Sequence, residues 1–552
     1  MLKRFSIHTG KRTHGFCALE ALRRLAGGET TGNAHNTTSK PRQGRQTHHR
    51  DFPSRALSGH KYVTDSFPAV SPPANVRSPF GTKEWLYKSW GILLILALLV
   101  VATTLPTTTN AQSSLKLPPY KKVKLKNGLT VLLMEQREIP IISFSFLVKA
   151  GSTADPAGKE GVASLTASLL RKGTKSRTSD QLSAELDFIG GQLGAGADYD
   201  YTSGRAEFLK KDLGKGLELL ADALLNPTFP ADEVTKLLKQ SIDGAKSAKD
   251  QAGGVIGDYF AAYLYGSHPY ARPTDGDEKS LPGITREDIT NFYESYYTPS
   301  NTILAVAGDF AVADMEKLLT DKFGGWADKK APAINLPAPV AATGKKLLLV
   351  DKPDSTQTYF EIGNVGVTRT NPDRVYIGVI NTLFGGRFTS MLNDALRVSS
   401  GLTYGARSAF DQRKAAGPFA ISTYTRNETT EKAIDMALDI LKRLHEKGIN
   451  EDDLKSAKNY IKGQYPPRIE STDQQANLLA QLEFYGLDER DINEYYAKID
   501  SMTLADAQRI IKQYFPLDNL VFVLIGKASE IEAVAKKYAT KFDTKSITQP
   551  GF

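Results

Sequence analysis

Two stretches of the sequence repeat the same series of features, and this repetition constrains the fold more than any other property of the chain. In each stretch a Thr-x-x-Asp segment that can cap a helix precedes a helical segment, a proline turn and an apolar strand that ends at glycine. The two copies are Thr285–Asp288, Pro299 and Thr302–Gly308, then Thr503–Asp506, Pro516 and Leu520–Gly526. The threonines are 218 residues apart and the prolines 217. This spacing predicts a duplicated domain of about 200 residues.

Other patterns place the predicted elements and the domain boundaries. Alternating apolar residues predict strands at Ile141–Val148 and Thr356–Ile362, and helical periodicity predicts helices at Ser179–Ile189, Lys215–Leu225 and Lys432–Lys447. The Ala- and Pro-rich stretch 327–344 is typical of a linker. We therefore predict an α+β fold with two homologous domains, residues 117–326 and 345–545, each with a mainly antiparallel sheet and helices packed on one face.

The net charge of +9 comes from the first part of the chain. Residues 1–111 contain 15 of the 70 Lys and Arg residues and 5 of the 61 Asp and Glu residues. Residues 112–552 therefore contain 55 basic and 56 acidic residues. The predicted globular part is nearly neutral, and its charge gives no reason to expect nucleic-acid binding. Cys17 is the only cysteine, which excludes a cysteine nucleophile, a cysteine zinc ribbon and a disulfide framework after that position.

An apolar run at residues 91–105 predicts export. Lys83 and Lys88 precede the run and the small-residue sequence Thr109-Asn110-Ala111 follows it, which is the order of a secretory signal. A spanning helix needs about 20 apolar residues, so the run is short for a permanent anchor. We predict that residues 83–111 are a signal peptide for transport across the inner membrane to the periplasm. An uncleaved signal would leave the protein anchored in the membrane.

Residues 1–82 precede this signal, although a secretory signal normally begins at the N-terminus. They are basic, rich in Arg, His, Ser and Gly, and without a sustained apolar period, which predicts disorder. One interpretation is a mis-set start, with translation beginning near Val76 or Leu86 at a non-AUG codon. The rival interpretation is an Arg-rich organelle presequence around Leu2–Leu25.

A helical segment in the first domain carries a family resemblance. Gly161 leads into this segment, which continues to Lys172-Gly173-Thr174. It resembles the signature helix of the pitrilysin/insulinase zinc peptidases, or inverzincins, in which a glycine leads into His-x-x-Glu-His and the helix continues to Lys-Gly-Thr. The resemblance implies that Ser164 and Ser168 occupy the positions of the two histidines, and Ala167 that of the glutamate.

These three positions lack the groups that the chemistry needs. Histidines at i and i+4 share one helix face and can bind one zinc ion, while the glutamate acts as general base on the metal-bound water. A hydroxyl is a poor zinc ligand, and a methyl group cannot take a proton. The resemblance places a third ligand near Asp243 or Gly244, where a lone carboxylate is interpreted as a solvated helix residue. We therefore predict a degenerate site and no zinc in this chain.

Only two of the eight histidines lie in the predicted globular part, His268 and His445, which are 177 residues apart. His268 lies in a Tyr-Gly-Ser-His-Pro-Tyr loop and is predicted to be structural. His445 lies in a charged helix and is predicted to be solvated. A two-histidine zinc site would require these distant segments to converge.

A second motif of the same family is matched in residue type and spacing. The family has a Gly-Gly turn, a helix that ends in Leu-Arg, and Gly-Leu-x-Tyr leading into a strand. The matching residues are Gly385-Gly386, Leu396-Arg397 and Gly401-Leu402-Thr403-Tyr404. The resemblance implies that Arg397 and Tyr404 donate hydrogen bonds to a bound peptide, which suits a guanidinium fork and a phenol. The alternative makes Arg397 a solvated cation in the last helical turn and Tyr404 a core aromatic.

The combination of a lost metal site and a retained Arg/Tyr pair implies a function through the family. The family contains two-chain proteases in which one subunit carries His-x-x-Glu-His and the other contributes Arg and Tyr. The resemblance implies that this chain is the second kind, a half-shell that closes with a zinc-bearing partner around extended peptide substrates and is inactive alone. One alternative is a stand-alone peptide-binding or scaffold protein that adds a peptide strand beside Ile141–Val148. Another is an active metalloendopeptidase with unrecognised ligands.

Overall fold

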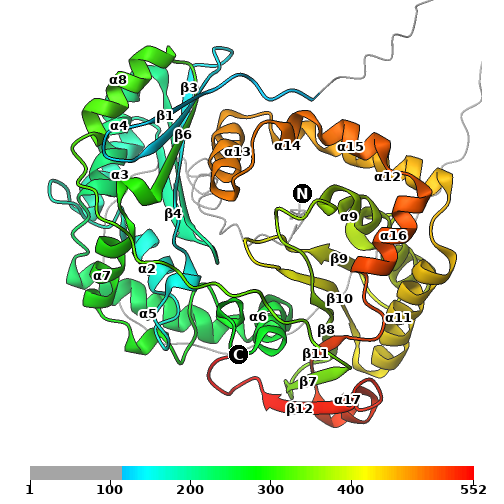
Figure 1. Ribbon diagram of the computed structural model, residues 1–552. Coiled ribbons are helices and arrows are strands. Elements are labelled where there is room, and N and C mark those ends of the chain that lie inside the picture. The colour runs from blue at the N-terminus through cyan, green and yellow to red at the C-terminus, as the bar shows by residue number, and fades with distance from the viewer. Residues whose placement is uncertain (1–114) are drawn as a thin grey trace, which may run out of the picture. The chain divides into compact units, whose positions relative to one another are not determined.

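Two six-stranded sheets organise the protein, one in each half of the duplicated sequence. The computed structural model describes residues 115–552 (Figure 1). The predictions for residues 1–82 and 83–111 lie outside the described residues. Within residues 115–552, no helix is both long enough and apolar enough to cross a membrane.

The first sheet has the strand order β1-β2-β6-β3-β5-β4. Its strands are β1 (Lys121–Lys124), β2 (Thr130–Glu135), β3 (Ile141–Val148), β4 (Gln192–Ala197), β5 (Thr202–Leu209) and β6 (Thr302–Gly308). The helices of this half are α2 (Val162–Leu169), α3 (Ser179–Phe188), α4 (Leu213–Leu225), α5 (Ala231–Ala248), α6 (Ala252–Tyr265), α7 (Arg286–Tyr296) and α8 (Val312–Phe323). Strands β2 and β6 are parallel, and the other neighbours are antiparallel.

The second sheet has the strand order β12-β7-β11-β8-β10-β9. Its strands are β7 (Lys346–Asp351), β8 (Gln357–Val365), β9 (Ala406–Phe410), β10 (Pro418–Arg426), β11 (Val521–Gly526) and β12 (Lys541–Ser546). The helices of this half are α9 (Arg374–Asn381), α10 (Met391–Asn393), α11 (Thr430–Lys447), α12 (Glu451–Gln464), α13 (Thr472–Tyr485), α14 (Arg490–Asn493), α15 (Tyr495–Ser501), α16 (Leu504–Tyr514) and α17 (Ala528–Ala535). Strand β7 is parallel to β11 and β12, and the other neighbours are antiparallel.

Five strands of the two sheets correspond in order and direction, which confirms the predicted duplication and the mainly antiparallel α+β fold. Strands β2, β6, β3, β5 and β4 of the first sheet match β7, β11, β8, β10 and β9 of the second. The sixth strand differs. Strand β1 precedes β2 in the sequence and is antiparallel to it, whereas β12 follows β11 and is parallel to β7.

The repeated helix caps form as predicted. Thr285 and Asp288 make a reciprocal capping box at the start of α7, and Thr503 and Asp506 make the same box at the start of α16. The strands that follow these helices, β6 and β11, are buried along their whole length. Their sequences are apolar at nearly every position because both faces of each strand are covered.

Each sheet has one face covered by helices of its own half and the other covered in part by a helix of the other half. The core against the second face of the first sheet joins α13 to β2, β3 and β6, through residues that include Leu479, Leu132, Leu147 and Ile303. The core against the second face of the second sheet joins α6 to β7 and β11, through residues that include Tyr259, Val350, Val521 and Val523. The prediction of helices on one face did not include this second layer, in which each half supplies one helix to the sheet of the other. The continuous apolar runs of β6 and β11 were a signal for it, because such runs require cover on both sides of the sheet.

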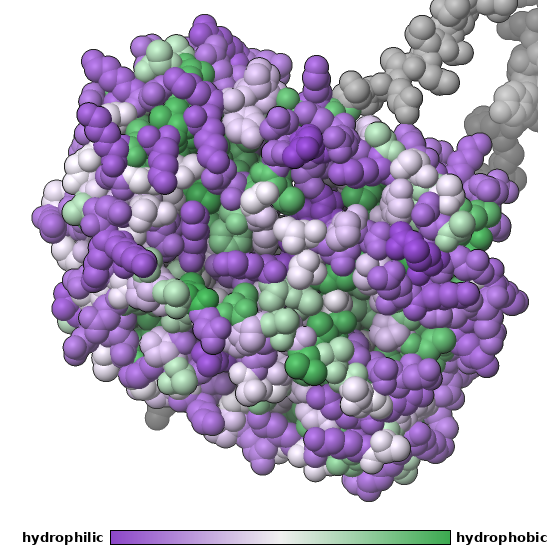
Figure 2. Space-filling view, in the orientation of Figure 1, coloured by the Kyte–Doolittle hydropathy of each residue, from purple (hydrophilic) through white to green (hydrophobic). Residues whose placement is uncertain are grey.

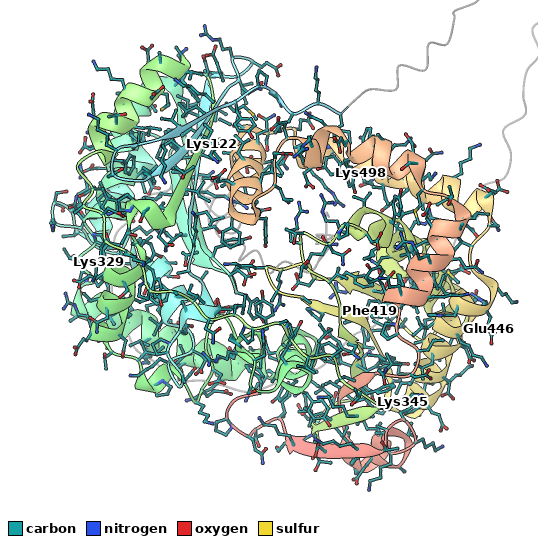
Figure 3. The ribbon with its side chains drawn as sticks, in the orientation of Figure 1. Lys122, Lys329, Lys345, Phe419, Glu446 and Lys498 are labelled. Carbon is teal, nitrogen blue, oxygen red and sulfur yellow. The ribbon has the colours of Figure 1, made fainter. Side chains whose placement is uncertain are left out.

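Polar contacts also join the two halves. The Asp200 carboxylate accepts hydrogen bonds from the Tyr270 hydroxyl at 2.8 and 2.9 Å and from the Lys414 backbone N–H at 2.8 Å. Asp200 and Tyr270 are buried, and Lys414 lies in the turn between β9 and β10. At the surface, Lys122 of β1 pairs with Glu483 of α13 at 2.7 Å (Lys122 is labelled in Figure 3). The buried contact fixes the β9–β10 turn against the first half.

The stretch 327–344, predicted to be a linker, contains no helix or strand and contacts both halves. His268 bonds the Pro337 carbonyl through Nε2 at 2.9 Å, while its Nδ1 accepts the Tyr270 N–H at 3.0 Å. The side chain of Asn364 pairs with the backbone of Ala342 in both directions, at 2.9 and 3.0 Å. These contacts hold the stretch in place.

Candidate functional site

Helix α2 contains the segment that resembles the zinc signature. The Asp155 carboxylate accepts hydrogen bonds from the backbone N–H groups of Gly161 and Ala163, both at 2.8 Å, and so caps the helix. Gly161 has φ +105°, and a Cβ there would lie 2.9 Å from the carbonyl oxygen of Asp275. The glycine is therefore required both by the backbone conformation and by the close approach of the loop that contains Asp275.

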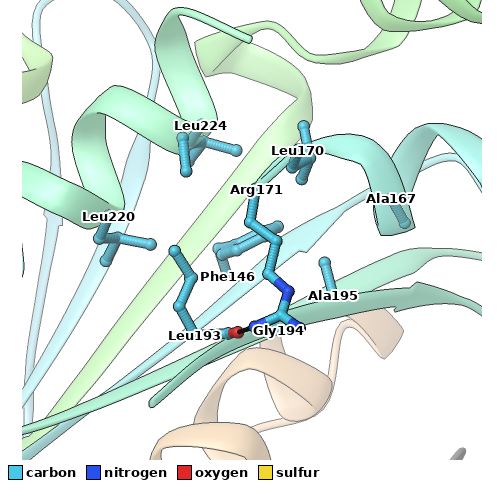
Figure 4. A pocket seen from close by; sticks show the side chains of 10 residues that line it. Phe146, Ala167, Leu170, Arg171, Leu193, Gly194, Ala195, Leu220 and Leu224 are labelled. Carbon is cyan, nitrogen blue, oxygen red and sulfur yellow. Dashed lines mark hydrogen bonds between the residues drawn. The ribbon is translucent and has the colours of Figure 1, made fainter. Parts of the chain in front are cut away.

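The three signature positions contain no group suited to zinc. Ser164 is half-buried and donates a hydrogen bond to the Asp275 carboxylate at 2.8 Å. Ala167 is 1% exposed, and Ser168 is half-buried. Ala167 lines a small pocket with room for about one water molecule, between α2, α4 and β4 (Figure 4). These hydroxyl and methyl groups do not fit the nitrogen, sulfur and carboxylate donors that zinc prefers.

The remaining candidates for a metal site lie apart from these positions. Asp243 is exposed on α5. Within residues 115–552, no group of three His, Cys, Asp or Glu side chains is arranged to hold a metal ion. His268 is buried, and its hydrogen bonds agree with the predicted structural role. The prediction that His445 is solvated is wrong, because this half-buried side chain bonds the Phe515 carbonyl oxygen through Nε2 at 2.7 Å.

The Lys-Gly-Thr end of the signature segment belongs to an ionic network around the buried Asp222 carboxylate. Thr174 donates a hydrogen bond to Asp222 at 2.7 Å, and Arg177 pairs with Asp222 and Glu185, both at 2.8 Å, and with Glu218. The Arg177 side chain is only 11% exposed. Thr174 therefore has a structural contact of its own in this network.

Replacing Arg177 with alanine is expected to lower the free energy of unfolding by about 3 kcal/mol, because it leaves Asp222 buried without its cation. Burial alone would raise the pKa of Asp222, but hydrogen bonds from Ser176, Thr174 and Arg177 outweigh it and lower the pKa. A lowered pKa means that the unfolded chain binds the proton more readily, so this stability is complete above the ordinary pKa of about 4 and is lost as the pH falls through the folded value.

Urea unfolding at pH 6 and pH 3 measures both effects. We expect the R177A variant to lose less stability than the wild type between these two pH values. The control is K442A, which removes a pair between side chains that are 65% and 59% exposed and should cost less than about 0.5 kcal/mol. Equal losses for R177A and K442A at pH 6 would contradict the assigned role.

The Arg397/Tyr404 segment differs in backbone from the predicted regular helix. Helix α10 is short and passes into a π-helical turn, η7 (Asp394–Ser399), which contains Arg397. Gly401 follows with φ +62°, the left-handed stop that was predicted. The N–H groups of Leu402 and Thr403 both donate to the Leu396 carbonyl, at 2.9 and 3.3 Å. These bonds turn the chain sharply from Arg397 toward β9.

Arg397 and Tyr404 both lie close enough to Tyr424 to affect its pKa, and both side chains remain available. Tyr404 is 77% exposed, which rules out the alternative of a core aromatic. Arg397 is half-buried, and its Cζ lies 4.7 Å from the centroid of the Phe388 ring. Within residues 115–552, neither the guanidinium nor the Tyr404 hydroxyl has a hydrogen-bond partner. The pKa of the nearby Tyr424 is raised, first by burial and then by Tyr359 and Tyr404, and Arg397 partly offsets this.

Two residues near this pair were not singled out by sequence reasoning, Phe388 and Asn393. Phe388 is 61% exposed, and Asn393 is 4% exposed. Both lie within the motif that was matched, but nothing in their spacing distinguished them from ordinary helix and turn residues. Their roles depend on contacts that only the folded chain shows.

Strand addition beside β3 (Ile141–Val148) is not possible in this fold. Strand β3 lies between β5 and β6 and is hydrogen-bonded on both sides. The alternation that identified it as a strand could not show its place in the sheet. Strand β4 is at the edge instead, and Arg171 reaches its Leu193 carbonyl oxygen at 3.5 Å (Figure 4).

Two family models match the chain in the order of the two halves. A model described as "Insulinase (Peptidase family M16)" matches residues 130–278, and one described as "Peptidase M16 inactive domain" matches residues 283–461. Together they span more than half of the 552 residues.

Individual proteins and solved structures are similar to the chain over about three quarters of its length. An uncharacterized zinc protease of Rickettsia felis is 25% identical over 77% of this chain and 97% of its own length. One of Bacillus subtilis is 23% identical over 72% and 96%. A crystal structure of a peptidase M16 inactive domain from Pseudomonas fluorescens has a TM-score of 0.70 at 26% identity, covering 74% of this chain and 98% of that one. A protease from Helicobacter pylori also has a TM-score of 0.70, at 23% identity over 74% and 100%.

Proposed function

Because the chain belongs to the insulinase family of peptidases, family M16, we propose that it is the non-catalytic, substrate-binding subunit of a two-chain zinc peptidase. In this proposal it contributes Arg397 and Tyr404 to the active site of a partner subunit. The partner belongs to the same family and carries His-x-x-Glu-His. The partner holds the zinc ion, which supplies the activated water. The substrates are extended peptides.

The observation that carries the proposal is the contrast between the two motifs. At the signature positions Ser164, Ala167 and Ser168 offer no metal ligand or general base, and the Ser164 hydroxyl is bonded to Asp275. At the second motif the side chains of Arg397 and Tyr404 are free of hydrogen bonds within the part of the chain that is described. Tyr404 is 77% exposed, so its ring contributes little to the core.

The chemistry of the pair suits peptide hydrolysis. A guanidinium offers five N–H donors in one plane, and a phenol can donate one hydrogen bond. Donors aimed at a peptide carbonyl oxygen stabilise the negative charge that develops on it during attack by water. Arg397 and Tyr404 would orient the peptide and stabilise this charge, while the proton transfers take place on the partner's residues.

The free edge of β4 favours a second candidate function, peptide capture by strand addition. Strand β4 ends the first sheet and has small residues at Gly194, Ala195, Gly196 and Ala197. An extended peptide can add to such an edge through backbone hydrogen bonds. A stand-alone peptide-binding protein would use this edge without any partner. A third candidate, a peptidase with unrecognised ligands, finds no support in the described residues.

The proposed function includes export of the chain. The apolar run 91–105 and its flanking residues support a signal peptide and a periplasmic location, with membrane attachment as the alternative if the signal is retained. Proteolysis outside the cytoplasm agrees with a globular part without cysteine.

Isolation of the native complex tests the proposed function. We expect the chain to co-purify with a His-x-x-Glu-His subunit, and we expect chelator-sensitive cleavage of an internally quenched peptide by the mixture but not by either chain alone. A stable homodimer that binds peptide without any peptidase partner would instead support capture at β4. Full peptidase activity of this chain alone would contradict both.

A further inference from the structure

We infer that Phe388 is a positioning residue for Arg397, whose ring holds the guanidinium where it can meet a peptide carbonyl group. The inference rests on the proposed function and adds a residue outside the Arg/Tyr pair. In the proposed role Phe388 does not touch the reacting atoms. It acts through Arg397.

The contact itself is a cation–π interaction. The Arg397 Cζ lies 4.7 Å from the centroid of the Phe388 ring, inside the range of about 6 Å in which a guanidinium is attracted to an aromatic face. Within residues 115–552, no hydrogen bond or ion pair restrains the guanidinium. The Phe388 ring is therefore the contact that limits the rotamers of this long side chain.

An aromatic ring leaves the N–H donors of an arginine free, whereas an acidic side chain would occupy some of them. The five N–H donors of a guanidinium lie in its plane, whereas the attraction to a ring uses its face. A carboxylate in the place of Phe388 would have taken two of those donors in a bidentate pair. The ring restrains Arg397 while all its donors remain available to a substrate.

The position of Phe388 is fixed by a buried side chain that also fixes the segment of Tyr404. The side-chain amide of Asn393 donates to the Phe388 carbonyl at 2.6 Å, and its oxygen accepts the backbone N–H of Ala406 at 3.3 Å. Asn393 is 4% exposed, and Ala406 lies two residues after Tyr404. The side chain of Asn393 thus links the backbone of Phe388 to the start of β9.

The exposure of Phe388 argues against a role in the core. Phe388 is 61% exposed, and most of the molecular face in Figure 2 is hydrophilic with apolar residues scattered over it. The nearby Val398 is 63% exposed and makes no comparable contact with a cation. An exposed phenylalanine contributes little to the stability of a core, so its substitution can be studied in a folded protein.

The test uses the purified two-chain complex and an internally quenched extended peptide. We expect F388L, which keeps the apolar bulk but loses the aromatic face, to lower kcat about two- to fivefold, the strength of an exposed cation–π contact. F388Y should retain kcat, and V398A should leave it unchanged. In the R397A background, F388L should have no further effect, because Phe388 acts only through Arg397.

A spectroscopic measurement on the full-length chain tests the contact without activity. The Nε–Hε resonance of Arg397, identified by its absence in R397K, should shift when F388L removes the ring current and should stay nearly in place in F388Y. An unmoved resonance in F388L, or an equal loss of kcat from F388L with and without Arg397, overturns the inference. If R397A itself leaves kcat unchanged, the proposed function fails, and the positioning role fails with it. If R397A lowers kcat but F388L does not, only the positioning role fails.

Discussion

Replacing Arg397 with alanine is expected to lower the kcat of the proposed two-chain peptidase about 100- to 1,000-fold, the usual effect of removing one donor to a developing oxyanion. The substitution removes a side chain that has no hydrogen bond to the described part of the protein, so the fold should be little affected. In the proposed function Arg397 acts in the reaction and not in assembly, so the variant should still associate with the proposed partner.

The measurement is steady-state cleavage of an internally quenched peptide by the reconstituted complex, with size-exclusion chromatography to show that the complex persists. The matched control is R443A, which removes an exposed arginine on α11 and should leave kcat unchanged. Equal turnover by R397A and the wild type would show that Arg397 takes no part in hydrolysis. Loss of the complex in R397A would assign it to assembly instead.

Replacing Asp200 with alanine is expected to lower the free energy of unfolding by about 3–5 kcal/mol, the usual cost of breaking a buried charged contact. The change leaves the buried Tyr270 hydroxyl and the partly buried Lys414 N–H without their acceptor. It also removes a negative charge close to Arg413, which is buried against the rings of Tyr199 and Tyr270. The pKa of Asp200 is raised by burial, and these partners partly offset that rise.

Thermal and urea unfolding of the full-length chain measure this loss. D200N keeps the shape and one acceptor oxygen, so it should cost less than D200A. The matched control is D243A, an exposed aspartate on α5, which should change stability by less than about 0.5 kcal/mol. A D200A variant as stable as D243A would mean that the buried contact does not hold the β9–β10 turn to the first half.

The repeated elements could be predicted from the sequence because their signals are local. Helix α7 begins at Thr285 and α16 at Thr503, where Thr-x-x-Asp sequences form capping boxes. Strand β3 was predicted with its observed bounds from the alternation at Ile141–Val148. Gly401 could be placed as a left-handed residue because glycine at the end of a helix commonly adopts that conformation.

What could not be predicted depends on residues far apart in the sequence. The exchange of α6 and α13 between the two sheets joins segments that no periodicity relates. The contact of Asp200 with Lys414 spans 214 residues. His445 was predicted to be solvated because its helix is charged, but it bonds Phe515, a residue 70 positions away. Alternation likewise identified β3 as a strand but not as an inner one, and this is why strand addition there was wrong.

The zinc content of each subunit shows whether this chain holds a metal ion of its own. The chain and its proposed partner are purified together from the native source and separated without chelator. The zinc content of each is then measured by elemental mass spectrometry. We expect one zinc ion per pair, all of it in the His-x-x-Glu-His subunit, and a content near zero in this chain. About one zinc ion per molecule of this chain, removable by chelator together with its own peptidase activity, would contradict the proposed function.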